Sequence, residues 1–516
     1  MLRSPTSARR PSSAPFAAAL VTGWSALAPA AAFAQAIEQS SLTPPGATGH
    51  EFFGHAIAAD GDLMVVGGPG ETGYSVSAGE AWVYRFDPLT AAWQFETSLA
   101  SSTPELSGAF GHRVAIHGDV IAVTSRYEDA ATAVDCGAVH LFRGGRAVGG
   151  TWVHQQKLTA ANPAFLDAFG EALALHDDVL LVGAPFTDTA VGPDAGQVHA
   201  FEYDSVGQVW NETTQLVDPG SYSYDHAGSS LAFDGTTAMV GIPGKAHVPG
   251  PQNVGSVLVW SYGTFGWTYS LELRAAVPQS ERFGSALAFD GVDLIVGAPS
   301  HTGAGFQNCG AVHFLTLRNG LWQPSGTHVN PDPWYFEAFG GTVALKGKVA
   351  LAATGRMNEA YSYRKGRFNK GWFLDQELGG SDKAIDNYYG NGLAISDERV
   401  MVGAPWHGGT YKGKVYVFDS DEINLSITPL QPQPGETISL SVYDGLPGDP
   451  VLVAVDELDG VPAWIPIGVF AFGSNHRFEL DADAEDPLFG IAVGIRAWKI
   501  SPTEPVVATE RVVVDM

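Results

Sequence analysis

Histidine has the widest chemical repertoire of the residue types in this sequence, because its imidazole can act as acid, base or metal ligand near neutral pH. Several of the 15 histidines recur at matching places: His140, His199 and His313 share one sequence context, and His55 and His112 each follow a Phe-Gly pair. Such recurrence is typical of a packing role, whereas a catalytic group more often occurs once. The HExxH, GxSxG and clustered Cys/His motifs are also absent from the sequence. We therefore predict no catalytic, cofactor-binding or metal-binding residues, and no cofactor.

The overall composition narrows the class of protein. The chain has 516 residues, 45% hydrophobic and 16% charged, which is typical of a globular protein with large cores. Its 62 glycines indicate many tight turns. The net charge of −27 repels phosphate, which disfavours nucleic-acid partners and anionic membranes. We interpret the acidic surface mainly as a source of solubility.

Residues 1–34 have the pattern of an export signal. Three arginines within the first ten residues precede the apolar run of residues 15–34, which ends in the small-residue pattern Ala32-Phe33-Ala34. Cleavage there would leave Gln35 as the first mature residue. A membrane anchor is the alternative, but the proline, glycine and many alanines of this run disfavour a stable span. We expect a secreted, extracellular or cell-envelope protein without a membrane span after cleavage.

A short motif recurs seven times along the chain. In its clearest form, residues 282–299 read RFGSALAFDGVDLIVGAP. The glycines of the Phe-Gly pair, or of its variants, are spaced by 57, 59, 58, 56, 56 and 50 residues and fall at Gly54, Gly111, Gly170, Gly228, Gly284, Gly340 and Gly390. Thirteen residues after each one comes the first residue of a Gly-Ala-Pro element, which is Thr124 and Ala353 in two copies and glycine in the other five. This fixed inner distance predicts one rigid unit, repeated seven times.

Each unit is predicted to contain four antiparallel strands. Apolar runs such as SALAF and VDLIV flank a two-residue turn, Asp290-Gly291 in this copy, and we expect positive φ at both turn residues. A third apolar run follows in each copy, and a fourth usually starts near a tryptophan. Seven such units predict an all-β fold, a seven-bladed β-propeller of four-stranded antiparallel blades.

The motif resembles the FG-GAP repeat, which also forms the propeller at the head of integrin α chains. FGHAIAADGDLMVVGGP, FGEALALHDDVLLVGAP and YGNGLAISDERVMVGAP carry the resemblance, which extends over residues 36–420. Many repeats of this family insert an acidic calcium-binding loop between the first two strands. Here a two-residue turn fills that place in all seven copies, so we predict no calcium site of the family type.

The spacing also indicates how the ring closes. Leu99 precedes Gly111 by 12 residues, and Leu42 precedes Gly54 by the same distance, although no fourth strand follows Phe418. We therefore expect residues 35–42 to supply the outer strand of the last blade, within a propeller domain of residues 35–420.

Cys136 and Cys309 occupy equivalent positions in copies 2 and 5, which lie too far apart in such a ring to form a disulfide. We expect them to be unpaired small residues. Asn211 and Asn424 begin glycosylation sequons, which are short enough to arise by chance.

The Phe-Gly repeat ends before residue 421, and a different strand pattern follows. About seven strand-like runs, separated by Pro, Gly and Asp, fill residues 421–516. This pattern predicts a small β-sandwich of immunoglobulin or fibronectin type without a disulfide. Such a module could be a spacer or a docking unit.

Aromatic residues mark one face of the predicted propeller. Because blade strands alternate in direction, the 4–1 loops (from the fourth strand of one blade to the first of the next) and the 2–3 loops share a face. These loops carry Tyr222, Tyr224, Trp334, Tyr335, Tyr388 and Trp406. They could bind a sugar or a protein partner, or they could fill gaps between blades.

Three functions remain open from the sequence. The first is a secreted or cell-surface recognition or adhesion protein of integrin-like architecture that binds an extracellular protein or glycan. The second is an extracellular carbohydrate-active enzyme, a lyase or a hydrolase, and the third is an architectural envelope component. A cluster of single-copy Asp, Glu, His or Tyr residues around the axial mouth would favour the enzyme.

Overall fold

A computed structural model of the protein describes residues 36–419 except 37, 48, 71–77, 247–251, 277–278, 355–358, 367–370, 383–386 and 398. Beyond residue 419 it describes the backbone of eight strands. The predicted export signal, residues 1–34, lies outside the described residues.

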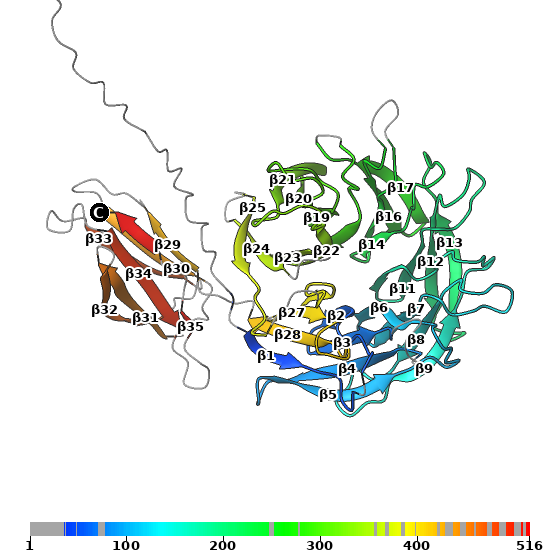
Figure 1. Ribbon diagram of the computed structural model, residues 1–516, viewed down its shortest axis with the longest axis horizontal. Coiled ribbons are helices and arrows are strands. Elements are labelled where there is room, and N and C mark those ends of the chain that lie inside the picture. The colour runs from blue at the N-terminus through cyan, green and yellow to red at the C-terminus, as the bar shows by residue number, and fades with distance from the viewer. Residues whose placement is uncertain are drawn as a thin grey trace, which may run out of the picture. The chain divides into compact units, whose positions relative to one another are not determined.

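Seven four-stranded antiparallel sheets form a ring, which confirms the predicted seven-bladed propeller (Figure 1). We number the blades by the order of their Phe-Gly motifs. From the axis outward, the blades consist of β2 (Ala56–Asp60), β3 (Leu63–Gly68), β4 (Glu80–Asp87) and β5 (Ala92–Leu99); β6 (Phe110–His117), β7 (Val120–Ser125), β8 (Ala138–Arg143) and β9 (Val153–Leu158); β10 (Ala172–His176), β11 (Val179–Ala184), β12 (Gln197–Asp204) and β13 (Val209–Leu216); β14 (Ser230–Phe233), β15 (Thr237–Ile242), β16 (Ser256–Gly263) and β17 (Gly266–Leu273); β18 (Ala286–Phe289), β19 (Asp293–Ala298), β20 (Ala311–Arg318) and β21 (Leu321–Val329); β22 (Phe339–Lys346), β23 (Val349–Thr354), β24 (Ala360–Lys365) and β25 (Trp372–Glu377); β26 (Leu393–Ile395), β27 (Arg399–Ala404), β28 (Lys414–Asp419) and β1 (Glu38–Leu42).

The second strand of each blade forms the centre of its core. All six residues of β3, β7, β11 and β19 are buried. Neighbouring blades cover both faces of these strands, so a continuous apolar run is stable there. Outer strands such as β13 and β17 have several exposed residues because one of their edges faces solvent.

The repeated glycines are explained by contacts between blades. A Cβ atom placed on Gly297 would lie 1.9 Å from the carbonyl oxygen of Gly340 in the next blade, and one on Gly403 would lie 2.0 Å from that of Gly54. The Phe-Gly glycine of one blade therefore packs against the Gly-Ala-Pro glycine of the preceding blade. At this distance no other residue fits without moving the backbone.

The hairpin turns differ from the expectation in one respect. Gly291 has a φ of 91°, but Asp290 is not among the residues with positive φ. Asp290 instead accepts hydrogen bonds on Oδ1 from the backbone N–H groups of Val292, at 3.1 Å, and Asp293, at 2.8 Å. The aspartate thus stabilises the turn as an acceptor, and only the glycine needs the left-handed conformation.

The ring is closed by strands from the two ends of the propeller sequence. β1 pairs antiparallel with β28, and Leu42 lies opposite Val415. β1 is therefore the outer strand of blade 7 (Figure 1). Ala36 adds a hydrogen bond from its backbone N–H to the carbonyl of Glu377, at 2.9 Å.

The C-terminal strands form two further sheets. One has the order β29-β30-β33, and the other has the order β32-β31-β34-β35 with β36 also pairing with β34. Their bounds are β29 (Asn424–Thr428), β30 (Thr437–Tyr443), β31 (Pro450–Leu458), β32 (Val461–Ala471), β33 (Arg477–Asp483), β34 (Ala492–Lys499), β35 (Val507–Ala508) and β36 (Val512–Asp515).

Candidate functional site

A cavity of about 440 Å³ lies at the propeller axis and is lined by residues from the innermost strands of all seven blades. In each blade, residues among the three that come directly after the Phe-Gly glycine line this cavity. The third of these is a branched aliphatic residue in every blade: Ile57, Val114, Leu173, Leu231, Leu287, Val343 and Leu393. The residues that directly follow the glycine are mostly polar: His55, His112, Glu171, Ser229, Ser285, Gly341 and Asn391. The cavity thus combines an apolar ring with a polar rim on the side of the 4–1 loops.

Blade 2 departs from the repeat at two positions of this cavity. Arg113 stands where the other blades have Ala, Ser, Thr or Gly, and Arg126 stands where five other blades have proline. Glu171 is the only acidic residue among the rim positions just described. Arg113, Arg126 and Glu171 are the charged residues among those that line this cavity. Two departures from the repeat pattern that line the same cavity mark blade 2 as a place to look for a local function.

The charged side chains contact one another across the boundary of blades 2 and 3. Glu171 lies 3.1 Å from Arg126 (Oε2 to Nη1), 3.4 Å from Arg113 (Oε1 to Nη2) and 3.5 Å from His112 (Oε2 to Nε2). The Nε atoms of His112 (Nε2) and Arg126 are buried and have no hydrogen-bond partner among the described residues. The cluster thus has unused polar atoms at the axial mouth.

The electrostatics of the cluster give it a positive charge at neutral pH. Burial, together with the charge of Arg113, lowers the pKa of His112 to about 4, so His112 is neutral. Burial alone would raise the pKa of Glu171, but its contacts with His112, Arg113 and Arg126 lower it to about 2. Two guanidinium groups and one carboxylate leave one net positive charge, within a chain whose net charge is −27.

A second cavity, of about 580 Å³, lies between blades 2 and 3 on the loop side. Its lining includes Phe165 and Leu166, which are exposed, and several aspartates. Arg126 lines this cavity as well as the axial one. The two cavities therefore adjoin at Arg126.

The loop aromatics named from the sequence have different environments. Tyr222, Tyr224, Trp334 and Tyr335 are between 47% and 62% exposed. Tyr388 and Trp406 are half-buried, with ring centroids 4.6 Å apart. Trp334 and Tyr335 are also in ring contact, and both contact Phe306 of the adjacent 2–3 loop.

The recurrent histidines of the third strands belong to buried polar groups. His140 Nε2 lies 2.8 Å from Glu128 Oε2, and His199 Nδ1 lies 2.8 Å from Glu212 Oε1. Lys157 adds a second ion pair to Glu128, at 2.6 Å. These contacts fit the packing role expected for His140 and His199. Cys136 and Cys309 are buried and unpaired, as expected.

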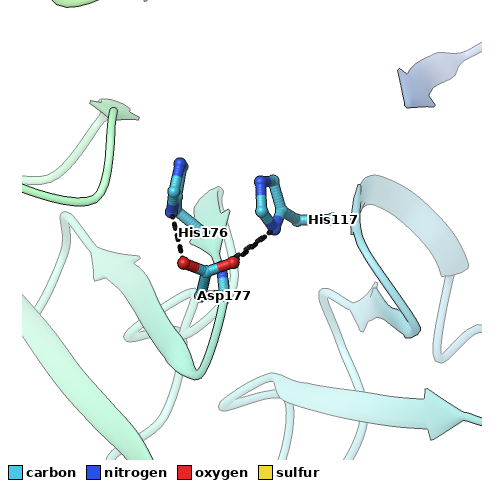
Figure 2. A group of neighbouring side chains, drawn as sticks. All are labelled: His117, His176 and Asp177. Carbon is cyan, nitrogen blue, oxygen red and sulfur yellow. Dashed lines mark hydrogen bonds and ion pairs between the residues drawn. The ribbon is translucent and has the colours of Figure 1, made fainter. Parts of the chain in front are cut away.

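A histidine pair lies on the opposite face, among the turns between first and second strands (Figure 2). The rings of His117 and His176 stack with centroids 4.1 Å apart, and the carboxylate of Asp177 lies 3.3 Å from His117 Nδ1 and 3.5 Å from His176 Nδ1. His117 Nδ1 also accepts a hydrogen bond from the backbone N–H of Asp177, at 2.9 Å. That bond would compete with a metal for the Nδ1 lone pair.

Comparison with known proteins supports the fold. Residues 37–84, 152–201 and 372–418 match the family described as FG-GAP repeat. No curated protein has a sequence that matches this chain.

The solved structures that match this chain have low sequence identity to it. Sqt1 of Saccharomyces cerevisiae is 10% identical, with 75% of this chain and 98% of that chain covered and a TM-score of 0.39. The periplasmic gluconolactonase of Pseudomonas aeruginosa is 15% identical over 63% of this chain and 84% of that chain, with a TM-score of 0.40. The propeller domain of the Trilobed protease of Pyrococcus furiosus is 9% identical over 74% and 95%, also with a TM-score of 0.40. These similarities identify no function.

Within the described part of the chain, no helix has the length and apolar character that crossing a membrane requires. The sequence did not reveal Arg113, Arg126 or Glu171 as site residues. Aligning the seven copies on their Phe-Gly glycines would have shown two arginines at small-residue and proline positions.

Proposed function

We propose that this protein is an exported recognition protein of the adhesion type, which binds its ligand on the loop side of the propeller. An acidic group of the ligand enters the axial cavity and contacts Arg113 and Arg126. The observation that carries this proposal is the pair of arginines at positions where the other blades have small residues or proline. Arginine binds carboxylate and sulfate groups through paired, charge-assisted hydrogen bonds.

The surroundings of the cavity favour an acidic glycan over a protein as the ligand. Tyr222, Tyr224, Trp334 and Tyr335 offer exposed rings in the same set of loops, and aromatic rings stack on sugars. The adjoining cavity between blades 2 and 3 gives room for neutral sugar units next to the acidic one, since several aspartates line it. We further propose that the C-terminal sheets form an immunoglobulin-like sandwich used for docking. This sandwich and the predicted export signal are consistent with an extracellular function.

The test uses variants that restore the residues of the other blades. Arg113→Ser and Arg126→Pro introduce residues that equivalent positions already contain. Thermal unfolding of the double variant checks that Glu171, left without its two arginine partners, does not unfold the protein. Retention on an array of acidic and neutral glycans is measured for the mature protein and for the double variant. We expect the mature protein to retain acidic glycans and the double variant to lose them. Equal retention by both proteins, or retention of neutral glycans alone, would contradict the proposal.

A second candidate function is a polysaccharide lyase that acts at the same cavity. The observation that favours it is the neutral His112, which lies beside Arg113, a cation able to neutralise a uronate carboxylate. In β-elimination the cation stabilises the charge that develops on the carboxylate while His112 takes the proton from the adjacent carbon. A carbon–carbon double bond then forms as the glycosidic C–O bond breaks, and the departing oxygen takes a proton from water or from the protonated His112. A glycosidase needs two facing carboxyl groups, and Glu171 is the one carboxylate among the lining residues of this cavity.

Product analysis separates the two functions. A lyase converts an acidic polysaccharide into an unsaturated product with new ultraviolet absorbance, and His112→Gln should abolish that reaction while binding persists. Binding without any such product supports the recognition function.

A further inference from the structure

We propose that Glu281, His301 and His313 of blade 5 form a binding site for a divalent transition-metal ion, with Zn²⁺ as the best match. This proposal is independent of the proposed ligand cavity. Glu281 lies in the loop before β18, His301 in the loop after β19, and His313 in β20. One ligand atom from each residue lies within 4.8 Å of the other two.

The donor atoms converge on one point. His301 Nδ1 lies 2.5 Å from Glu281 Oε2, and His313 Nε2 lies 3.6 Å from the same oxygen. Gln279 Nε2 lies 2.8 Å from His301 Nδ1 and 3.3 Å from Glu281 Oε2. This amide nitrogen donates hydrogen bonds and is not a ligand, so its bond to His301 Nδ1 must give way when a metal binds there. Two imidazole nitrogens and one or two oxygens are a donor set that tetrahedral Zn²⁺ accepts.

Two of these donors have no other use in the described part of the chain. Glu281 Oε1 and His313 Nε2 are buried and lack a hydrogen-bond partner there. Only 1% of the Glu281 side chain is exposed, so solvent does not provide a partner. A buried carboxylate oxygen without a partner is costly. His313 Nδ1 is held by the Thr327 hydroxyl at 3.0 Å, which orients Nε2 toward Glu281 as second-shell contacts do in metal sites.

Carboxylates in the loops of three other blades pair with a lysine, although at positions that are not equivalent to Glu281, and blade 5 contains no lysine. Lys157 pairs with Glu128 in blade 2, Lys245 with Asp218 in blade 4, and Lys414 with Asp382 in blade 7. The ion pairs of Glu281 among the described residues are with His301 and His313 only. A bound cation would supply Glu281 with a positive charge that no described lysine or arginine supplies.

The nitrogen donors define the class of ion. Calcium and magnesium prefer all-oxygen sites, whereas imidazole binds Zn²⁺, Co²⁺, Ni²⁺ and Cu²⁺. The site would also fix the 2–3 loop that begins near His301 and carries Phe306. Phe306 contacts Trp334 and Tyr335, so metal binding would order this part of the aromatic surface.

The test is a Zn²⁺ titration of the mature protein, made without a histidine tag and with His117→Gln and His176→Gln to remove the exposed histidine pair. We expect one Zn²⁺ per chain and a metal-dependent rise in Tm. Glu281→Gln and His301→Gln should each weaken binding at least about tenfold, since even outer-shell changes cost that much. His407→Gln is the matched control: His407 occupies the equivalent loop of blade 7 beside Asp382 and Lys414, and its loss should leave Zn²⁺ affinity unchanged.

The protein with its natural Glu281, His301 and His313 provides a second measurement, which does not depend on the folding of the variants. Co²⁺ in place of Zn²⁺ should give the intense visible absorption of a tetrahedral site and should be displaced by Zn²⁺. Absence of saturable Zn²⁺ binding, an octahedral Co²⁺ spectrum, or affinity unaffected by both Glu281→Gln and His301→Gln would each overturn the proposal.

Discussion

Arg126 Nη1 lies 3.1 Å from Glu171 Oε2, and this ion pair joins blade 2 to blade 3 at the mouth of the axial cavity. It connects two residues that both depart from the repeat pattern. Because Arg126 also lines the second cavity, the pair lies where the two cavities adjoin.

This ion pair predicts opposite effects of two charge changes. Glu171→Gln raises the net charge of the cluster by one and should strengthen binding of an acidic oligosaccharide, whereas Arg126→Gln should weaken it. Each change in a partly exposed cluster is worth roughly 0.5–1 kcal/mol, or about two- to fivefold in Kd. Calorimetric titration with uronate oligosaccharides at low salt measures both effects. Effects of the same sign in both variants would show that charge does not govern binding.

His112 predicts a specific pH dependence of stability. Its folded-state pKa of about 4 lies below the usual value of 6.5, so between these two pH values the unfolded chain binds a proton that the folded chain does not. The free energy of unfolding should therefore fall as pH decreases from about 6.5 to 4, by at most about 3 kcal/mol from this residue. Urea unfolding at several pH values should show a steeper fall for the natural protein than for His112→Gln. Parallel curves would contradict the assignment.

The contact between Gly297 and Gly340 predicts a large cost for one added methyl group. Gly297→Ala would place Cβ 1.9 Å from the Gly340 carbonyl oxygen, so blades 5 and 6 would have to separate. We expect a loss of about 3 kcal/mol or more in the free energy of unfolding, which is the upper range for overpacking. Gly263→Ala is the control, since a Cβ there has no neighbour within 4 Å. Denaturant unfolding of both variants decides the matter, and equal stability would disprove the packing argument.

We predict that removal of β1 lowers the stability of the propeller. A chain that begins at Thr43 lacks the strand that pairs with β28 and leaves that edge open. We expect a loss of roughly 3 kcal/mol or more and increased aggregation. A chain that begins at Gln35 is the control and should have full stability. Thermal unfolding and size-exclusion chromatography compare the two, and an unchanged Tm in the shorter chain would refute a structural role for β1.

The fold could be predicted from the sequence because its signals are local and repeated. The distance of thirteen residues from each Phe-Gly glycine to the Gly-Ala-Pro element reflects a hairpin of fixed length, and the structure has that hairpin in each blade. The conformation of Asp290 was wrongly predicted, because the side chain stabilises the turn as a hydrogen-bond acceptor instead of adopting positive φ.

The candidate site was harder to predict because its residues come from different blades. Arg113 and Arg126 lie near each other in sequence, but Glu171 is 45 residues beyond Arg126 and meets it only after the blades pack. The exposed aromatics were found from loop positions alone. Their burial depends on neighbouring loops, as the contact of Trp334 with Phe306 shows, and a sequence pattern does not report such contacts.

The pairing of β1 with β28 also sets an order of events during synthesis. The partner of β1 emerges from the ribosome about 370 residues after β1 itself, which at typical elongation rates is a delay of roughly 20–75 s. During that interval β1 has no native partner, while the six blades encoded between the two strands can form one after another. Closure of the ring is therefore the last step, and the nascent chain needs protection from non-native strand pairing until β28 arrives.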